Sequence, residues 1–372
     1  MFIFRRLTRS LIIQKYIVKM AHLFLRRAYV METSVAYQIL CQWSKDMGRS
    51  CLQCNKIGAY AYDLSIIIPA YNAYSYIEAC INSILNQTTK YTFHVFVVND
   101  GSTDQTAELL HQYAEDKHIT IYEEENCGAA AARNRALKHL NSTYVMFVDA
   151  DDLLEPNAID KLLNAAYAEN ADAVEGGYFI LKDGRKQIGS QMPDKTFDHA
   201  LGVLSGFTCM KVFRSSLFED VSFPVGYWFE DTVISMILFP KVERAVTIGD
   251  MVYSYRANPK GMTSAAKGSR KALDSFWIMI QLMKDHAALN LPENNEYHLQ
   301  LLRQIHITYL RTRNAPEQVK KSIFVLSAVI INSIFNENVL TDNWKMQMLE
   351  TAVKQRKYGL YRLLCEMNES LN

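Results

Sequence analysis

From residue 63 onward, short β-branched runs alternate with stretches of helical periodicity, and this alternation limits the fold more than any other feature of the sequence. The predicted strands cover residues 64–71, 93–98, 118–122 and 144–148, and the predicted helices cover 78–85, 106–113, 129–140 and 156–168. Strands that alternate with helices form a mostly parallel sheet with helices on both faces, and ligands bind at the carboxyl ends of the strands. The sequence therefore predicts an α/β fold with its site at that edge of the sheet.

The remainder of the chain follows other patterns. Residues 174–189 predict a hairpin around Asp183-Gly184, and residues 247–256 predict a second strand pair around Gly249-Asp250. From about residue 265, helical spacing dominates and carries no chemical motif; the predicted helices cover 275–286, 298–312, 317–335 and 344–367. We expect three parts, which are a basic N-terminal extension at 1–62, an α/β domain at 63–264 with halves 63–173 and 174–264, and a C-terminal helical accessory domain at 265–372.

The near-neutral net charge of +1 conceals an uneven distribution. Residues 1–62 carry 10 basic and 2 acidic side chains, residues 63–263 carry 16 and 27, and residues 264–372 carry 14 and 10. An acidic middle argues against nucleic acid as a partner, because that function needs a basic working face. The basic flanks would instead suit contact with an anionic membrane surface.

The N-terminal segment allows two interpretations. Seven Lys or Arg residues precede the first acid, Glu32, and they interrupt the apolar residues every few positions. This pattern fits a basic amphipathic helix lying on a membrane, and it equally fits a loose, partly disordered extension, since Met20 and Met31 could also initiate the chain. Elsewhere, the longest uncharged apolar run, at 322–335, is shorter than the roughly 20 residues that a membrane span needs.

The seven cysteines are odd in number and scattered, which indicates a reducing compartment rather than a disulfide framework. Cys51 and Cys54 have the spacing of a zinc or redox pair, with Cys41 nearby. A fourth ligand at normal spacing is missing, so a structural role is favoured over a metal site.

Several acids stand where predicted strands end. Asp149, Asp151 and Asp152 lie within four residues directly after the strand at 144–148. Such crowded carboxylates repel one another and persist mainly where a cation neutralises them, and oxygen ligands select Mg²⁺ or Mn²⁺. The alternative is that Asp152 caps the following helix while the others are solvated turn residues.

Four motifs occur in order, each at a predicted strand-to-helix junction. They are Ser65–Asn72 (SIIIPAYN), Val97–Asp104 (VVNDGSTD), Asn126–Leu137 (NCGAAAARNRAL) and Phe147–Asp152 (FVDADD). Together they resemble the nucleotide-sugar-binding half of family-2 glycosyltransferases of the bacterial polysaccharide-biosynthesis type, which have the Rossmann-like GT-A fold. The resemblance is strong over residues 63–173, continues more loosely to about 264, and covers neither the basic leader nor the helical tail.

The resemblance implies roles for the strand-end residues of the first half. Pro69, Tyr71 and Asn72 look like the first-strand loop around the nucleoside. Asp100 is similar to the carboxylate that holds the uracil, and Arg133 to the arginine near the base and diphosphate.

The Asp-x-Asp motif of the family matches Asp149, Ala150 and Asp151. The resemblance implies that Asp151 is the direct ligand of Mn²⁺ or Mg²⁺ and that Asp149 lies nearer the ribose or a metal-bound water. The chemistry agrees with these roles, because a diphosphate leaving group gains negative charge that a divalent cation stabilises. The sequence has no glycine-rich phosphate loop that would otherwise supply this stabilisation.

A second constellation, Phe223–Thr232 (FPVGYWFEDT), places two adjacent carboxylates after a group of aromatic residues. A Glu-Asp pair that opens a helix is commonly only a favourable charge at the positive end of the helix dipole. The resemblance implies that Glu230 and Asp231 form the catalytic pair, with Asp231 as the base that takes the acceptor proton. Trp228 and the neighbouring Tyr227 could stack on a sugar or belong to the core.

Two cations complete the set of predicted site residues. Lys211 lies in a Met-Lys-Val-Phe-Arg segment similar to one of the family, and Arg256 ends a Tyr-x-Tyr-Arg segment that the family also has. Both are candidates for contact with acceptor or phosphate. A structural pairing of Arg256 with an acid is an equally good interpretation.

The resemblance implies a metal-dependent, inverting hexosyltransferase. It would move a hexose or N-acetylhexosamine from a UDP-sugar to a hydroxyl of a glycan or polyprenol-linked glycan, in the cytoplasm and at the inner face of the cell membrane. One rival is a non-catalytic nucleotide-sugar-binding module. The other, a sugar-nucleotidyltransferase, would need a glycine-rich, arginine-containing loop where this chain has Pro69–Asn72.

Overall fold

The computed structural model describes residues 28–258 and 268–367. The chain divides into two compact units. The unit that we call the sheet unit comprises residues 48–261 and 280–291, and the helical unit comprises 1–47, 262–279 and 292–372. The three-part division at 62 and 264 stays a prediction, and its second boundary lies outside the described residues.

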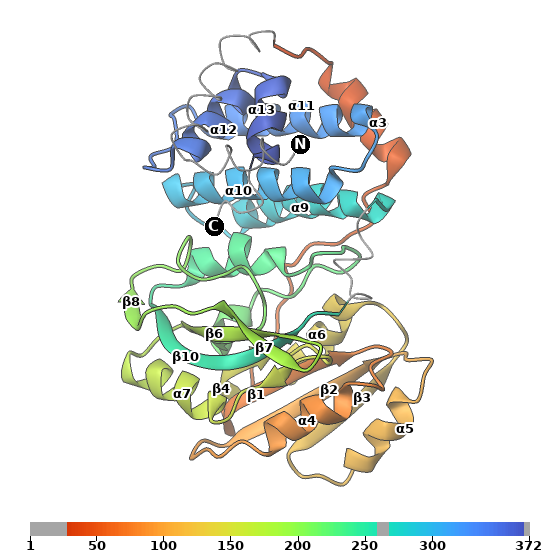
Figure 1. The fold of residues 1–372 in the computed structure, drawn as a ribbon, viewed down its shortest axis with the longest axis vertical. Helices are drawn as coiled ribbons and strands as arrows, with labels where there is room; N and C mark the ends of the chain where they lie inside the picture. The colour runs from red at the N-terminus through yellow and green to blue at the C-terminus, as the bar shows by residue number, and fades with distance from the viewer. Residues whose placement is uncertain (1–27, 259–267, 368–372) are drawn as a thin grey trace. The chain divides into compact units, whose positions relative to one another are not determined.

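The sheet unit is built on a ten-stranded sheet (Figure 1). Its order is β3-β2-β1-β4-β9-β6-β10-β5, with β7 paired to β6 and β8 paired to β10. Pairing is parallel among β1 to β4 and between β6 and β10, and antiparallel elsewhere. The strands are β1 (Tyr62–Ala70), β2 (Phe93–Asp100), β3 (Ile119–Glu124), β4 (Ser142–Phe147), β5 (Leu153–Leu154), β6 (Ala173–Lys182), β7 (Arg185–Ser190), β8 (Lys195–Phe197), β9 (Lys211–Arg214) and β10 (Ala245–Arg256).

Helices cover both faces of the first half of this sheet. Helices α4 (Ile77–Leu85) and α7 (Ala158–Ala168) bury their apolar sides in one core with alternate residues of β1, and α5 (Thr106–Leu110) joins them through Leu110. Helix α6 (Ala129–Leu137) packs on β1 and β2 outside that core. The prediction of an α/β fold with a covered, parallel first half is confirmed.

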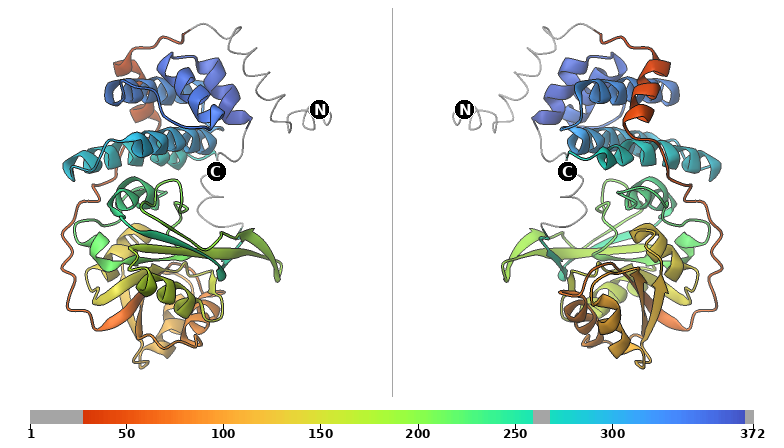
Figure 2. Two further views of the ribbon diagram at one scale, coloured as in Figure 1. Left: turned by 90° about the vertical axis from the view of Figure 1, so that its left-hand side faces the viewer. Right: turned by 90° about the vertical axis from the view of Figure 1, so that its right-hand side faces the viewer.

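The second half of the sheet confirms one predicted hairpin and corrects another. Strands β6 and β7 form a hairpin that projects from the sheet (Figure 2), with Asp183 and Gly184 in its turn. The strand pair predicted around Gly249-Asp250 is wrong, because β10 is one continuous strand. It runs parallel to β6 on both sides of that dipeptide, and a register shift between Thr247 and Met251 absorbs the extra residues.

The helical unit contains α3 (Thr33–Trp43), α10 (Asn295–Thr312), α11 (Glu317–Ile334), α12 (Trp344–Lys354) and α13 (Tyr358–Glu366). Helix α9 (Asp274–Ala288) begins in this unit, and its second part belongs to the sheet unit. The single helix predicted at 344–367 is wrong, since Arg356 adopts a left-handed backbone conformation that separates α12 from α13. Within the described parts of the chain, no helix has both the length and the apolar character for a membrane span.

The described part of the predicted N-terminal extension, residues 28–62, contains helix α3 and a following segment with little regular secondary structure. Helix α3 packs against α11 and buries Ala36 and Leu40. Cys51 and Asn55 are buried in the sheet unit, while Cys54 is exposed. The predicted membrane helix falls on residues 1–27, which lie outside the described part of the chain.

Candidate active site

The loop after β1 is tied to the loop after β2. Asn72 has a positive φ of 49° and accepts a hydrogen bond from the Thr103 amide at 2.8 Å, while its own amide donates to Ser102 at 3.0 Å. Pro69 lies beyond the last residue of β1 that pairs with β4, where a strand tolerates a missing N–H. Tyr71 is half exposed. The three residues predicted to surround a nucleoside therefore lie together at the carboxyl end of β1.

Asp100, the last residue of β2, is buried and organises the loop that opens α6. Its two carboxylate oxygens accept the amide hydrogens of Cys127 at 2.8 Å and Gly128 at 2.9 Å. Burial raises the pKa of Asp100, and these two amides partly oppose that effect. Each carboxylate oxygen can accept more than one hydrogen bond, so the group can hold this loop and still receive a nucleobase N–H.

Arg133 joins two acidic groups from distant parts of the sequence. Its Nη1 atom donates to Oε1 of Glu230 at 2.6 Å, and its Nη2 atom donates to Oδ1 of Asp149 at 2.9 Å. The guanidinium lies 5.3 Å from the centre of the Phe223 ring, and the side chain is almost wholly buried. Burial alone would lower the pKa of Arg133, but Glu230 and Asp149 outweigh that effect and raise it.

The loop after β4 is fastened to the end of β10. Asp152 is fully buried and accepts hydrogen bonds from the Tyr253 hydroxyl at 2.8 Å and from the Arg256 amide at 2.6 Å. Burial, together with repulsion from Asp149 and Asp151, raises the pKa of Asp152 to about 8. The interpretation of Asp152 as a helix cap is wrong, because α7 starts only at Ala158 and Asp152 is engaged by β10 instead.

Asp151 and Arg256 lie side by side at this loop. The Arg256 Nε atom donates to the Asp151 carbonyl oxygen at 2.7 Å, and the guanidinium lies 5.1 Å from the centre of the Tyr76 ring. The Asp151 carboxylate accepts a hydrogen bond from Asn258 at 2.9 Å through Oδ2, and burial raises its pKa. Arg256 therefore reaches the Asp-x-Asp loop mainly through the backbone rather than through an ion pair with an acid.

The chemistry of the donor atoms fits a hard divalent cation at Asp149 and Asp151, with the buried Ala150 between them. Asp149 is partly exposed, and the Oδ2 atom of Asp151 accepts the hydrogen bond from Asn258. Carboxylate oxygens of this kind suit Mn²⁺ or Mg²⁺.

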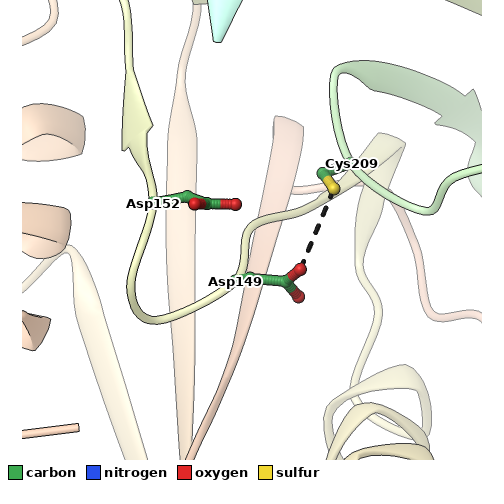
Figure 3. A group of neighbouring side chains, drawn as sticks. All are labelled: Asp149, Asp152 and Cys209. Carbon is green, nitrogen blue, oxygen red and sulfur yellow. Dashed lines mark hydrogen bonds between the residues drawn. The ribbon is translucent and has the colours of Figure 1, made fainter. Parts of the chain in front are cut away.

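Ligand atoms of Asp149, Asp152 and Cys209 also gather within 4.8 Å of one another (Figure 3). In this group, burial and the two aspartates raise the pKa of Cys209 well above its usual range, so the thiol stays protonated. Its Sγ atom lies 3.9 Å from Oδ2 of Asp149 and donates a hydrogen bond to it. Asp152 already uses both carboxylate oxygens in hydrogen bonds. A thiol suits Mn²⁺ or Mg²⁺ less well than carboxylate oxygens do, so within this group the two aspartates are the better candidates to hold a hard cation.

The Glu230-Asp231 pair follows a strained residue, Phe229, whose φ is 69°. The carbonyl oxygens of Glu230 and Asp231 accept the amides of Val233 and Ile234 and so start the short π-helical turn Ile234–Leu238. The Glu230 carboxylate is buried against Arg133, whereas Asp231 is partly exposed. This division leaves Asp231 as the member of the pair that a substrate can approach.

The two aromatic residues before this pair differ in burial. Tyr227 is buried, with its ring against Gly48, and so belongs to the core. Trp228 is only partly buried.

Lys211 requires a correction. Its side chain is fully buried, and its ammonium group donates to Ser205 Oγ at 3.0 Å and to the Phe207 carbonyl oxygen at 2.8 Å. A buried carboxylate oxygen of Glu175 lies 3.3 Å away. A wholly buried ammonium with these partners does not reach an acceptor, so Lys211 holds the 205–209 loop in place.

Four residues near the site are absent from the predicted site residues. The sequence predicts Asp152 either as one of the carboxylates that a cation neutralises or as a helix cap, and it assigns no site role to Cys209, Tyr253 or Asn258. For Tyr253, the Tyr-x-Tyr-Arg segment gives a signal. Its apolar surroundings predict a buried strand, and a buried tyrosine hydroxyl needs a hydrogen-bond partner.

The chain is similar to known proteins in both sequence and fold. Residues 65–222 match the family model described as glycosyl transferase family 2. The chain is 27% identical over 65% of its length to the glycosyltransferase GlyA of Streptococcus pneumoniae, and 31% identical over 54% to the uncharacterized glycosyltransferase EpsJ of Bacillus subtilis. The matched regions span 37% and 62% of these two relatives.

Among solved structures, Staphylococcus aureus TarS (residues 1–349) in complex with UDP-GlcNAc superposes with a TM-score of 0.64 at 21% identity. The superposition covers 82% of this chain and 90% of that one, so the likeness extends over the fold. Residues 65–222, within the sheet unit, therefore form a glycosyltransferase family 2 domain, and the sheet unit has the GT-A fold.

Proposed function

We propose that the protein is an inverting glycosyltransferase of cell-surface polysaccharide synthesis. It transfers a hexose or N-acetylhexosamine from a UDP-sugar to a hydroxyl of a glycan or lipid-linked glycan. The observation that carries this proposal is the bridge from Arg133 to Glu230 and Asp149, because it unites the Asp-x-Asp motif with the Glu-Asp pair in one site. The complex of TarS with UDP-GlcNAc supports UDP as the nucleotide of the donor.

On the donor side, the carboxyl ends of the strands would bind the nucleotide. Asp100 would accept the N–H of the uracil, while Tyr71 and Asn72 would line the nucleoside. Asp149 and Asp151 would hold Mn²⁺ or Mg²⁺, which when bound offsets the negative charge of the diphosphate. Arg133 would keep the Asp149 carboxylate oriented through its 2.9 Å hydrogen bond.

On the acceptor side, Asp231 would act as the general base. Its carboxylate would take the proton of the acceptor hydroxyl while that oxygen attacks the anomeric carbon from the face opposite the diphosphate. The bond between the anomeric carbon and the diphosphate breaks in the same step, and UDP leaves with the electron pair. A single displacement of this kind inverts the anomeric configuration. General-base catalysis typically contributes about a hundred- to ten-thousandfold to the rate.

UDP release in the presence of Mn²⁺, measured over a panel of UDP-sugars and glycan acceptors, tests this proposal. We expect acceptor-dependent turnover in the wild type and a loss of at least a hundredfold in Asp231→Asn, with unchanged affinity for the UDP-sugar. Asp183→Asn removes the same charge from the β6–β7 turn and should leave turnover intact. Tight binding of the UDP-sugar without any turnover would instead identify a nucleotide-sugar-binding module.

The place of action in the cell is a separate part of the proposal. A lipid-linked acceptor would be reached at the cytoplasmic face of the membrane, where anionic lipid attracts the net charges of +8 on residues 1–62 and +4 on residues 264–372. Removing residues up to 62 would damage the fold, so the test keeps the full chain and replaces Arg5, Arg6 and Arg9 by Gln. Binding to vesicles with anionic lipid should weaken in that variant, and unchanged binding would contradict the role of the leader.

A further inference from the structure

Residues 48–55, which we call the strap, run antiparallel along residues 218–227 within the sheet unit. The strap precedes β1 as an extended trace (Figure 2). It contacts the 218–227 segment through four backbone hydrogen bonds. These are Arg49 N to Val225 O at 2.9 Å, Ser222 N to Cys51 O at 2.8 Å, Gln53 N to Asp220 O at 3.2 Å, and Asn55 N to Glu219 O at 2.7 Å, and the second and third of them form the antiparallel bridge between Leu52 and Val221.

Side chains fix both ends of this pairing. At one end, the buried Asn55 donates through Nδ2 to the carbonyl oxygens of Phe218 at 2.7 Å and Val221 at 3.0 Å. At the other end, Gly48 lies directly against the ring of Tyr227, so close that a Cβ atom on Gly48 would come within 2.0 Å of two ring carbons. Only glycine fits there without moving the ring.

The strap is itself anchored from a third segment. The buried carboxylate of Asp285 accepts hydrogen bonds from the Ser50 hydroxyl at 2.8 Å and from the Cys51 amide at 2.9 Å. Residue 285 belongs to the sheet unit, as does the strap. The strap is therefore held to the unit independently of the segment that it supports.

The supported segment leads directly into the Glu230-Asp231 pair. On its other side, Asn134 exchanges two hydrogen bonds with the Phe223 backbone, each 2.7 Å long. Asn134 follows Arg133, which holds Glu230 at 2.6 Å. The 218–227 segment thus lies between the strap and α6. Its last residue, Tyr227, precedes Glu230 by three positions in the sequence.

We propose that the strap is a positioning element for the catalytic pair, with Gly48 and its contact to Tyr227 as the decisive point. The inference rests on the proposed role of Asp231 and adds a part of the chain that precedes the family domain. A general base must meet the acceptor hydroxyl at hydrogen-bond distance, and a displacement of about 1 Å can cost about a hundredfold in rate. Strap residues touch no substrate in this proposal and act only through the 218–227 segment.

The test is Gly48→Ala, with Gly58→Ala as the matched control. The same added methyl group at Gly58 meets its nearest atom at 3.7 Å, an ordinary contact. We expect kcat for sugar transfer to fall at least tenfold in Gly48→Ala, with KM for the UDP-sugar within twofold of the wild type, and both constants to stay within twofold in Gly58→Ala. A folded Gly48→Ala variant with wild-type kcat would overturn the proposal.

A double-mutant cycle with Tyr227→Leu separates positioning from general damage. If the strap acts through the Tyr227 ring, Gly48→Ala should lower kcat less than twofold further in the Tyr227→Leu background. If Gly48→Ala lowered kcat as much in the Tyr227→Leu variant as in the wild type, the strap would not act through the Tyr227 ring. If Gly48→Ala fails to fold, Asp285→Asn is the second variant, because it loosens the anchor of the strap without adding atoms. We expect kcat to fall at least threefold in Asp285→Asn, with KM for the UDP-sugar within twofold of the wild type. An unchanged kcat in Asp285→Asn would contradict the proposed role of the strap.

Hydrogen exchange gives a readout that does not depend on turnover. The amides of Thr232, Val233 and Ile234, which bond to residues 229–231, should exchange at least tenfold faster in Gly48→Ala than in Gly58→Ala. If the wild type shows no transfer with any donor, the proposed function fails while this comparison still decides on the strap. Equal exchange in the two variants would overturn it.

Discussion

The Nη1 atom of Arg133 donates to Oε1 of Glu230 at 2.6 Å, although 97 residues separate the two along the chain. Both side chains are almost wholly buried, so each charge depends on the other for compensation. The same guanidinium reaches Asp149. One buried cation thereby links the Asp-x-Asp motif of the first half of the sheet unit to the Glu230-Asp231 pair of the second half.

Arg133→Lys should lower kcat/KM for sugar transfer by about ten- to a hundredfold. An ammonium group is a point charge that cannot reproduce the two hydrogen bonds of the guanidinium, and one hydrogen bond to a charged group is worth roughly 1.5–3 kcal/mol. Steady-state kinetics measure the effect. Arg135→Lys, on the same helix and half exposed beside Glu124, should change kcat/KM less than twofold. Equal values of kcat/KM in Arg133→Lys and Arg135→Lys would contradict a linking role for Arg133.

Asp151→Asn should weaken the response to Mn²⁺. The substitution removes one of two carboxylates proposed to hold the cation, and we expect the Mn²⁺ concentration for half-maximal transfer to rise at least about tenfold. Thermal unfolding with and without Mn²⁺ gives a second measurement, because a ligand of the folded state raises the transition temperature. Asp183→Asn should retain the full Mn²⁺ response. A wild-type response in Asp151→Asn would exclude that carboxylate as a ligand.

Asp152 should make the sheet unit less stable as the pH rises. Its pKa is about 8 in the folded protein and near 4 when unfolded, so between these values the folded state binds a proton that the unfolded state has lost. Its contribution to the free energy of unfolding therefore declines from about pH 4 to about pH 8.

The variant Asp152→Asn cannot ionise and should escape this decline. Relative to the wild type, its free energy of unfolding should gain roughly 1 kcal/mol per pH unit between pH 5 and pH 8. Urea denaturation in the presence of a chelator measures the difference. A constant difference between wild type and variant over this range would show that Asp152 does not titrate as proposed.

Glu350 in the helical unit should behave in the opposite way. Burial would raise its pKa, but His298, Lys354 and the Val339 amide outweigh burial and lower it. For a lowered carboxyl pKa, the stabilisation is complete above the unfolded pKa of about 4.3 and is lost as the pH falls through the folded pKa. Glu350→Gln should therefore reduce the free energy of unfolding by roughly 1–3 kcal/mol at pH 7.

This loss should shrink as the pH is lowered below about 4, where the wild type also carries a neutral side chain. Glu337→Gln, at an exposed position before α12, serves as the control and should change the free energy of unfolding by less than about 0.5 kcal/mol. A pH-independent effect of Glu350→Gln would argue for lost packing instead of lost charge.

Local sequence patterns were sufficient to predict the first half of the sheet unit. Strands β1 to β4 and the helices between them appear where apolar periodicity predicts them, because burial on a sheet or helix face leaves a local pattern of period 2 or 3.6. The four motifs also identified the family, since each occupies a strand-to-helix junction that the local pattern defines.

Tertiary contacts decided the rest. Gly249-Asp250 favours a turn locally, yet β10 continues because both of its sides pair with β6. Lys211 has the sequence of a surface cation, yet Glu175 and Ser205 enclose it. Residues 48–55 have no periodicity of their own, and only pairing with a segment more than 160 residues later gives them structure. Such partners lie far apart in the chain, so no local pattern records them, and only the folded protein brings them together.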